Sequence, residues 1–139
     1  MTYTKEQAKE EISGLIKRLE EVMKDGKERD YSEADVGSKF VIPLIENLGW
    51  NIESIDEVKE QKRTLIGPVD YSLNIDKKSK LLIEIKRFEN LDGYRIKGGK
   101  KQTYSEQVIN YAWSIKADWA ILTNFKETRL YYSHVKKPE

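Results

Sequence analysis

The feature that most constrains the fold is the segment at 81–86, Leu-Leu-Ile-Glu-Ile-Lys, the most apolar strand-like stretch of the chain. A strand that is apolar at nearly every position is buried on both faces, so it requires a sheet with other layers packed above and below it. Because alternate residues of a strand share a face, the three odd-numbered residues are predicted on one side. Glu84 and Lys86 then share the other side with Leu82. The segment predicts a covered sheet with an acid and a base on one of its faces.

Helices are predicted around this strand. Helical periodicity indicates a first helix over 4–25, which Thr4 begins with the spacing of a capping box. A second helix starts after the N-cap Ser32, ends near Gly49 in a left-handed conformation, and should be kinked by Pro43. The apolar face of a third helix is formed by Gln107, Val108, Tyr111, Ala112 and Ile115.

Strands are predicted over 51–58, 69–75, 81–88, 119–123 and 128–132, with a hairpin turn at 76–80. Polar stretches at 59–67 and 89–102 are predicted as loops. The order of elements predicts an α/β fold, with a mixed central β-sheet flanked by helices in a single domain over 1–139. In this domain the N-terminal helix at 4–25 packs on a core at about 30–133, although it could instead mediate dimerisation.

Composition excludes several kinds of site. The 139 residues contain no cysteine, which excludes disulfides and thiolate metal sites, and the lone His134 cannot form a multi-histidine zinc site. No apolar run approaches the roughly 20 residues of a membrane-spanning helix. We therefore expect a cytoplasmic protein with no membrane partner.

The three tryptophans, Trp50, Trp113 and Trp119, lie in apolar contexts and are expected in the core.

Asp70 opens the strand that precedes the segment at 81–86, so a hairpin can bring its carboxylate towards Glu84. Two converging carboxylates form an anionic pocket of oxygen ligands, which suits Mg²⁺, with Mn²⁺ as a substitute. Lys86 beside them can orient or help deprotonate a water, while the metal polarises a phosphodiester. The spacing also occurs by chance. The alternative is an edge strand with an exposed Glu84–Lys86 ion pair, which contributes little to stability.

Taken together, several segments resemble the PD-(D/E)xK nuclease superfamily, and within it the N-terminal nuclease domain of the restriction subunit of type I restriction-modification systems. The central motif is Asp70 followed by Glu84-Ile85-Lys86, with Val69 where the motif's name expects proline. The other segments, in the family's order between about 30 and 132, are Ser32-Glu33-Ala34, Ile42-Pro43-Leu44, Leu48-Gly49-Trp50, Gln107 to Ala112 and Ile121 to Asn124. The resemblance implies a restriction-endonuclease-like core.

The resemblance also implies roles for the matched residues. Asp70 and Glu84 match the metal-binding carboxylates, aided by the Ile85 carbonyl, and Lys86 matches the catalytic lysine. Glu33 matches an acidic residue on the early helix that reaches the metal site directly or through water. Alternatively, Glu33 only favours the positive end of its helix.

Gln107 and Tyr111 match the QxxxY motif of type I restriction and RecB-like nucleases, which assigns them to the catalytic site. They are four residues apart and therefore share a helical face. Packing within the helix layer is the alternative. Arg87, Lys97, Lys100 and Lys101 are predicted DNA contacts, the lysines in a loop that tracks phosphates, although a solvated basic loop has the same composition.

The sequence therefore predicts a Mg²⁺-dependent DNA endonuclease domain of the restriction type. The alternatives are a catalytically silent DNA-binding or assembly module on the same fold, and an RNA nuclease or junction resolvase with the same chemistry. The restriction subunits also carry an ATP-driven translocase, whereas the glycines at 98–99 lack the spacing of a phosphate-binding loop. The expected partners are DNA and either a helicase or translocase, modification subunits or a second copy of the chain.

Overall fold

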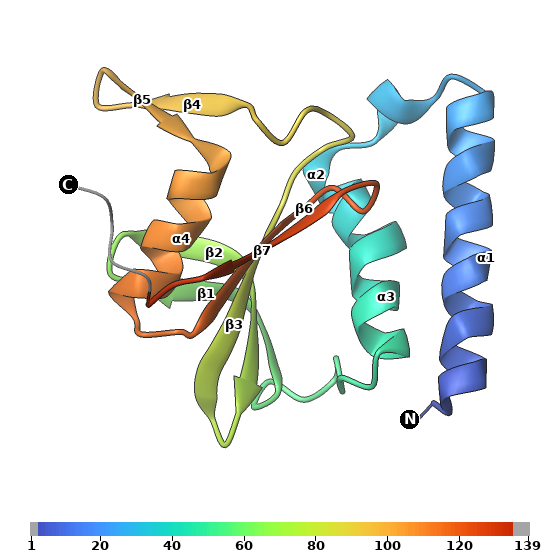
Figure 1. Ribbon diagram of the computed structural model, residues 1–139, viewed down its shortest axis with the longest axis horizontal. Coiled ribbons are helices and arrows are strands. Elements are labelled where there is room, and N and C mark those ends of the chain that lie inside the picture. The colour runs from blue at the N-terminus through green and yellow to red at the C-terminus, as the bar shows by residue number, and fades with distance from the viewer. Residues whose placement is uncertain (1–2, 135–139) are drawn as a thin grey trace.

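A five-stranded mixed sheet in the order β1-β2-β3-β6-β7 forms the centre of the computed structural model, which describes residues 3–134 (Figure 1). Strands β3 and β6 run parallel, and the other neighbours are antiparallel. The fold is therefore mixed α/β, as predicted. The strands of the sheet are β1 (Val58–Thr64), β2 (Gly67–Ile75), β3 (Lys78–Ile85), β6 (Trp119–Thr123) and β7 (Thr128–Tyr132).

Helices cover both faces of this sheet (Figure 1). A segment of consecutive helical turns packs on one face, α1 lies outside it, and α4 covers the other face. A separate two-stranded ribbon precedes α4. These elements are α1 (Lys5–Lys24), a 3₁₀ turn (Glu28–Asp30), α2 (Glu33–Val36), a π-helical turn (Gly37–Val41), α3 (Ile42–Asn47), β4 (Tyr94–Lys97), β5 (Lys100–Thr103) and α4 (Tyr104–Ser114).

The predicted caps are confirmed. The Thr4 hydroxyl accepts a hydrogen bond from the Gln7 amide at 3.1 Å, and the Gln7 side chain accepts one from the Thr4 amide at 3.0 Å. Ser32 caps α2 in the same reciprocal way. Gly49 follows α3 with φ +103°, which glycine adopts without strain. These local signals fix where the covering helices begin and end.

A π-helical turn lies directly before α3, which carries Pro43 in its first turn, while the kink expected at Pro43 stays a prediction. Proline has no amide hydrogen, so the Lys39 carbonyl four residues earlier loses its ordinary helical partner. The guanidinium of Arg18 on α1 donates to this carbonyl. The irregularity therefore gives α1 a polar attachment to the helical segment that covers the sheet.

The alternation predicted for the segment at 81–86 is confirmed by two separate cores. Ile83 and Ile85 belong to the core under α2 and α3, whereas Leu82 belongs to the core under α4. Glu84 and Lys86 are buried as well. An acid and a base thus lie on the α4 side of the central strand.

Some predicted boundaries are wrong. The strand predicted at 51–58 and the loop predicted at 59–67 are replaced by β1 at 58–64, a polar strand that pairs only with β2. One edge of β1 faces solvent, so it needs no apolar run. The loop predicted at 89–102 contains the β4–β5 ribbon. Strand β3 ends at Ile85 rather than at 88.

The prediction that Trp113 lies in the core is also wrong. This residue lies on the solvent side of α4 and is 69% exposed. Trp50 and Trp119 are half-buried, and Trp50 packs against the core under α3.

Across residues 3–134 we find no helix with both the length and the apolar character needed to span a bilayer.

Candidate functional site

Asp70 and Glu84 meet across strands β2 and β3. Tyr71 lies opposite Ile83 in the antiparallel register, and Asp70 and Glu84 are the next residues along the two strands. Their carboxyl groups are close enough for a side-chain hydrogen bond. The backbone of β3 also orients the Asp70 carboxylate, since its Oδ2 accepts a hydrogen bond from the Ile85 amide at 2.7 Å. The hairpin therefore brings the two predicted carboxylates together.

The surroundings of the Glu84 carboxyl favour its protonated form. It is 6% exposed, and burial is the largest cause that raises its pKa, to about 9. The hydrogen bond to Asp70 and the negative charge of Asp70 add to the increase, and the Lys86 ammonium opposes it. Two carboxylates this close cannot both be charged unless a cation compensates them. The surroundings of Glu84 therefore favour a neutral carboxyl beside Asp70 when no cation is bound.

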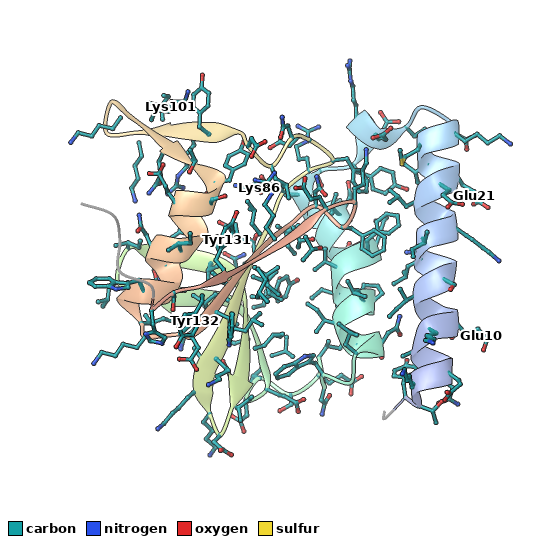
Figure 2. The ribbon with its side chains drawn as sticks, viewed as in Figure 1. Glu10, Glu21, Lys86, Lys101, Tyr131 and Tyr132 are labelled. Atoms are coloured by element: carbon teal, nitrogen blue, oxygen red, sulfur yellow. The ribbon has the colours of Figure 1, made fainter. Side chains whose placement is uncertain are left out.

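Lys86 follows β3 directly and lies between α2 and the first turns of α4 (Figure 2). Its amide donates to the Thr123 carbonyl of β6 at 2.9 Å, which extends the parallel ladder and fixes the backbone. Its ammonium lies 3.9 Å from Oε1 of Glu33 and 3.5 Å from Oε1 of Gln107. Only 9% of the side chain is exposed, so this charge is held in place by its neighbours.

Gln107 and Tyr111 lie on the buried face of α4, as their spacing predicts. The Gln107 side chain faces Lys86, and its Nε2 donates to the Tyr111 hydroxyl at 3.2 Å. Both residues are 4% exposed. The QxxxY pair therefore forms a chain of hydrogen bonds that ends at the Lys86 ammonium, while its chemical role stays a prediction.

Glu33 does not join Asp70 and Glu84 as a third ligand. Among residues 3–134, no three His, Cys, Asp or Glu side chains are grouped so that they could hold one ion. The side chain of Glu33 is half-exposed and faces Lys86 instead. Burial raises the pKa of its carboxyl, with Lys86 acting in the opposite direction. The Ile85 carbonyl stays a predicted ligand.

Two residues near the site were missed by the sequence analysis. The ring centroid of Tyr104 lies 4.2 Å from the Lys86 ammonium, which is a cation–π contact. Nε2 of Gln61 approaches Oδ1 of Asp70 at 3.5 Å, from a left-handed backbone position (φ 51°) in β1. Tyr104 lies three residues before Gln107, so helical spacing could have indicated it. Gln61 gave no signal, because its strand was predicted as a loop.

The Tyr104 ring packs against Gly93, where the absence of a Cβ leaves room for it. A Cβ on Gly93 would lie 2.6 Å from Cε2 of Tyr104, so the ring or the backbone at Gly93 would have to shift. We expect Gly93→Ala to cost about 1–3 kcal/mol of stability, as overpacking does. Urea denaturation measures this cost. Gly14→Ala on α1 is the matched control, since a Cβ there meets nothing within 4 Å. Equal stability of Gly93→Ala and wild type would contradict the contact.

The predicted DNA contacts lie outside this buried site. The Arg87 guanidinium donates to the Arg29 carbonyl at 3.1 Å, which ties the chain after β3 to the 3₁₀ turn. Lys97, Lys100 and Lys101 are exposed on the β4–β5 ribbon. The structure therefore separates a buried carboxylate–lysine centre from an exposed basic element.

In comparisons with known proteins, no family model, no curated protein and no solved structure matches the chain.

Proposed function

We propose that this chain is a Mg²⁺-dependent DNA endonuclease domain with a restriction-endonuclease-like core. The observation that carries the proposal is that the carboxyl groups of Asp70 and Glu84 meet between β2 and β3, with the buried Lys86 two residues after Glu84. Burying the Glu84 carboxyl beside a second, half-buried carboxylate is costly in any protein that does not use the pair. The cost is understandable if the pair serves to hold a divalent cation.

The donor set fits Mg²⁺. Asp70 and Glu84 offer carboxylate oxygens at one point, and hard cations with oxygen ligands accept one or two carboxylates from the protein, with waters completing the shell. When bound, Mg²⁺ would polarise the phosphodiester and stabilise its developing charge. Binding of the cation would favour loss of the proton from Glu84, because the cation would supply the compensating charge.

Lys86 would act on the attacking water. Its ammonium is fixed by Gln107 and Glu33 from two sides, so it can hold a water oxygen in line with the scissile bond. The water oxygen would form the new bond to phosphorus, and the bond to the leaving oxygen would break. Gln107 and Tyr111 would keep Lys86 in position. The buried QxxxY chain of hydrogen bonds is what supports this assignment.

Metal binding is the direct test. Isothermal titration with Mg²⁺, and with Mn²⁺ as a second probe, should give one site on the wild type and none on Asp70→Asn. Glu10→Gln is the matched control, because it removes an exposed carboxylate on α1, far from the site (Figure 2). Absence of binding to the wild type, or equal binding to Asp70→Asn, would refute the proposal.

Cleavage of supercoiled plasmid DNA in Mg²⁺ is the second part of the test. Conversion to nicked or linear product should require the metal and should be lost in Asp70→Asn. A silent DNA-binding or assembly module on the same fold would bind neither metal at this pair. The two measurements therefore separate the nuclease from its rival.

A further inference from the structure

We propose that the β4–β5 ribbon enters the groove of double-stranded DNA and is the element that anchors the substrate at the site. The proposal rests on the nuclease function in taking DNA as the substrate, but the ribbon itself is observed independently of the catalytic residues. It forms a sheet of its own, apart from the central one, and projects from the start of α4 (Figure 1).

All charged side chains of the ribbon are positive. Residues 93–105 contain no Asp or Glu, whereas the ribbon carries Arg95, Lys97, Lys100 and Lys101. Lys97 lies directly opposite Lys100 beside the turn. Like charges in opposite positions destabilise a strand pair, so this arrangement costs stability when nothing compensates it. A polyanion such as DNA would remove this repulsion, because its phosphates neutralise the lysines. Each such contact also releases a condensed counterion, which favours binding.

The dimensions of the ribbon fit a groove of duplex DNA. Its arms are four residues each, or about 14 Å long, with a turn of two glycines at positive φ. The major groove of B-form DNA is about 12 Å wide and 8.5 Å deep and admits a two-stranded β-ribbon. Lysines on both arms at the tip can then reach phosphates on both walls. Ile96, which is 65% exposed, is placed to contact base edges or sugars.

Two features argue against other nucleic acids. Single-strand binding uses aromatic rings as stacking platforms, but the ribbon has only Tyr94, and the Lys101 ammonium covers that ring at 3.9 Å from its centroid. The major groove of A-form RNA is too narrow for side chains to read. Duplex DNA is therefore the partner that the ribbon fits.

The base of the ribbon is joined to the catalytic centre. The Tyr104 amide donates to the Gly93 carbonyl at 3.1 Å, which closes the ribbon at its lower end. The Tyr104 ring lies under the Lys86 ammonium. A duplex held by the tip of the ribbon would thus be held at a fixed distance from Lys86. Figure 2 shows Lys101 on the ribbon and Lys86 below it.

Fluorescence anisotropy with a labelled duplex, in EDTA to prevent cleavage, tests the inference. The variant Lys97→Gln/Lys100→Gln/Lys101→Gln should bind duplex DNA at least about 10-fold more weakly than wild type, and its dependence on salt should fall by about 2–3 in log–log slope. The control Lys9→Gln/Lys17→Gln/Lys24→Gln removes the same charge from exposed positions on α1 and should bind within about twofold of wild type. Circular dichroism verifies that both variants are folded.

Wild type should also bind the duplex at least about 10-fold more tightly than the single strand or an RNA duplex of the same sequence. Equal loss of affinity in both triple variants would show a nonspecific effect of net charge and overturn the inference. Unchanged binding by the ribbon variant, no binding by wild type, or a preference for single strands or RNA would do so too. Duplex binding through the ribbon with no metal-dependent cleavage would refute the nuclease function alone.

Discussion

Glu84→Gln is expected to stabilise the metal-free protein at neutral pH while it abolishes cleavage. The amide has the shape of the protonated carboxyl and can still donate to Asp70, but it cannot become charged. Metal binding loses a carboxylate ligand, so cleavage should fall by at least about 10³-fold, the upper end of what the removal of one electrostatic group costs. A residue kept for stability would not show opposite effects on stability and on activity.

The pH dependence of this stability difference follows from the raised pKa of Glu84. Its pKa is about 9 in the folded protein against an ordinary value of 4.5, so the folded state favours the protonated carboxyl. The stabilisation from protonated Glu84 is complete below about pH 4.5 and is lost as the pH rises towards 9. Glutamine does not titrate. The free energy of unfolding of Glu84→Gln should therefore exceed that of wild type by an amount that grows between pH 5 and pH 9.

Urea denaturation at several pH values measures this difference. At pH 7 it should reach at most about 3 kcal/mol, and it should vanish near pH 4. Glu10→Gln on α1 removes an exposed carboxylate and should show no such trend. If Glu84→Gln were less stable than wild type at every pH, then Glu84 would be an anion paired with Lys86 and not a neutral carboxyl.

The convergence of Asp70 and Glu84 depends on a detail that the sequence does not reveal. Asn74 lies opposite Ser79, whereas Leu73 lies opposite Leu81, so the register of the hairpin shifts at a bulge. Without that shift, Asp70 would face Ile83, which points to the other side of the sheet. One residue of register decides which face a side chain occupies. The sequence indicated a hairpin at 76–80, but not the bulge that aligns the two carboxylates.

Local signals were sufficient where one residue type has one clear effect. The caps Thr4 and Ser32, the termination at Gly49 and the limits of β6 and β7 all follow from such signals. The predictions failed where burial is partial. An edge strand may be polar along its length, as β1 is, and a short ribbon outside the core has no apolar alternation to mark it.

The variant Lys86→Ala distinguishes a catalytic role of Lys86 from charge compensation. If Lys86 serves the attacking water, cleavage should fall by about 10²-fold or more, as it does when a positioned acid–base or orienting group is lost. Metal binding should persist, because Asp70 and Glu84 remain. If Lys86 only compensates nearby carboxylates, the variant should lose stability instead, and no cleavage should depend on it.

Two further measurements make this distinction sharp. Lys86→Met keeps most of the aliphatic side chain and removes the ammonium that lies over the Tyr104 ring, so it separates lost packing from a lost charge. Alanine leaves room for a small primary amine, and ethylammonium added to Lys86→Ala should restore part of the cleavage but should not restore it to Lys86→Met, where the stem fills the space. Rescue confined to the alanine variant assigns the function to the ammonium at that position. Unchanged cleavage by a folded Lys86→Ala protein would remove Lys86 from the mechanism.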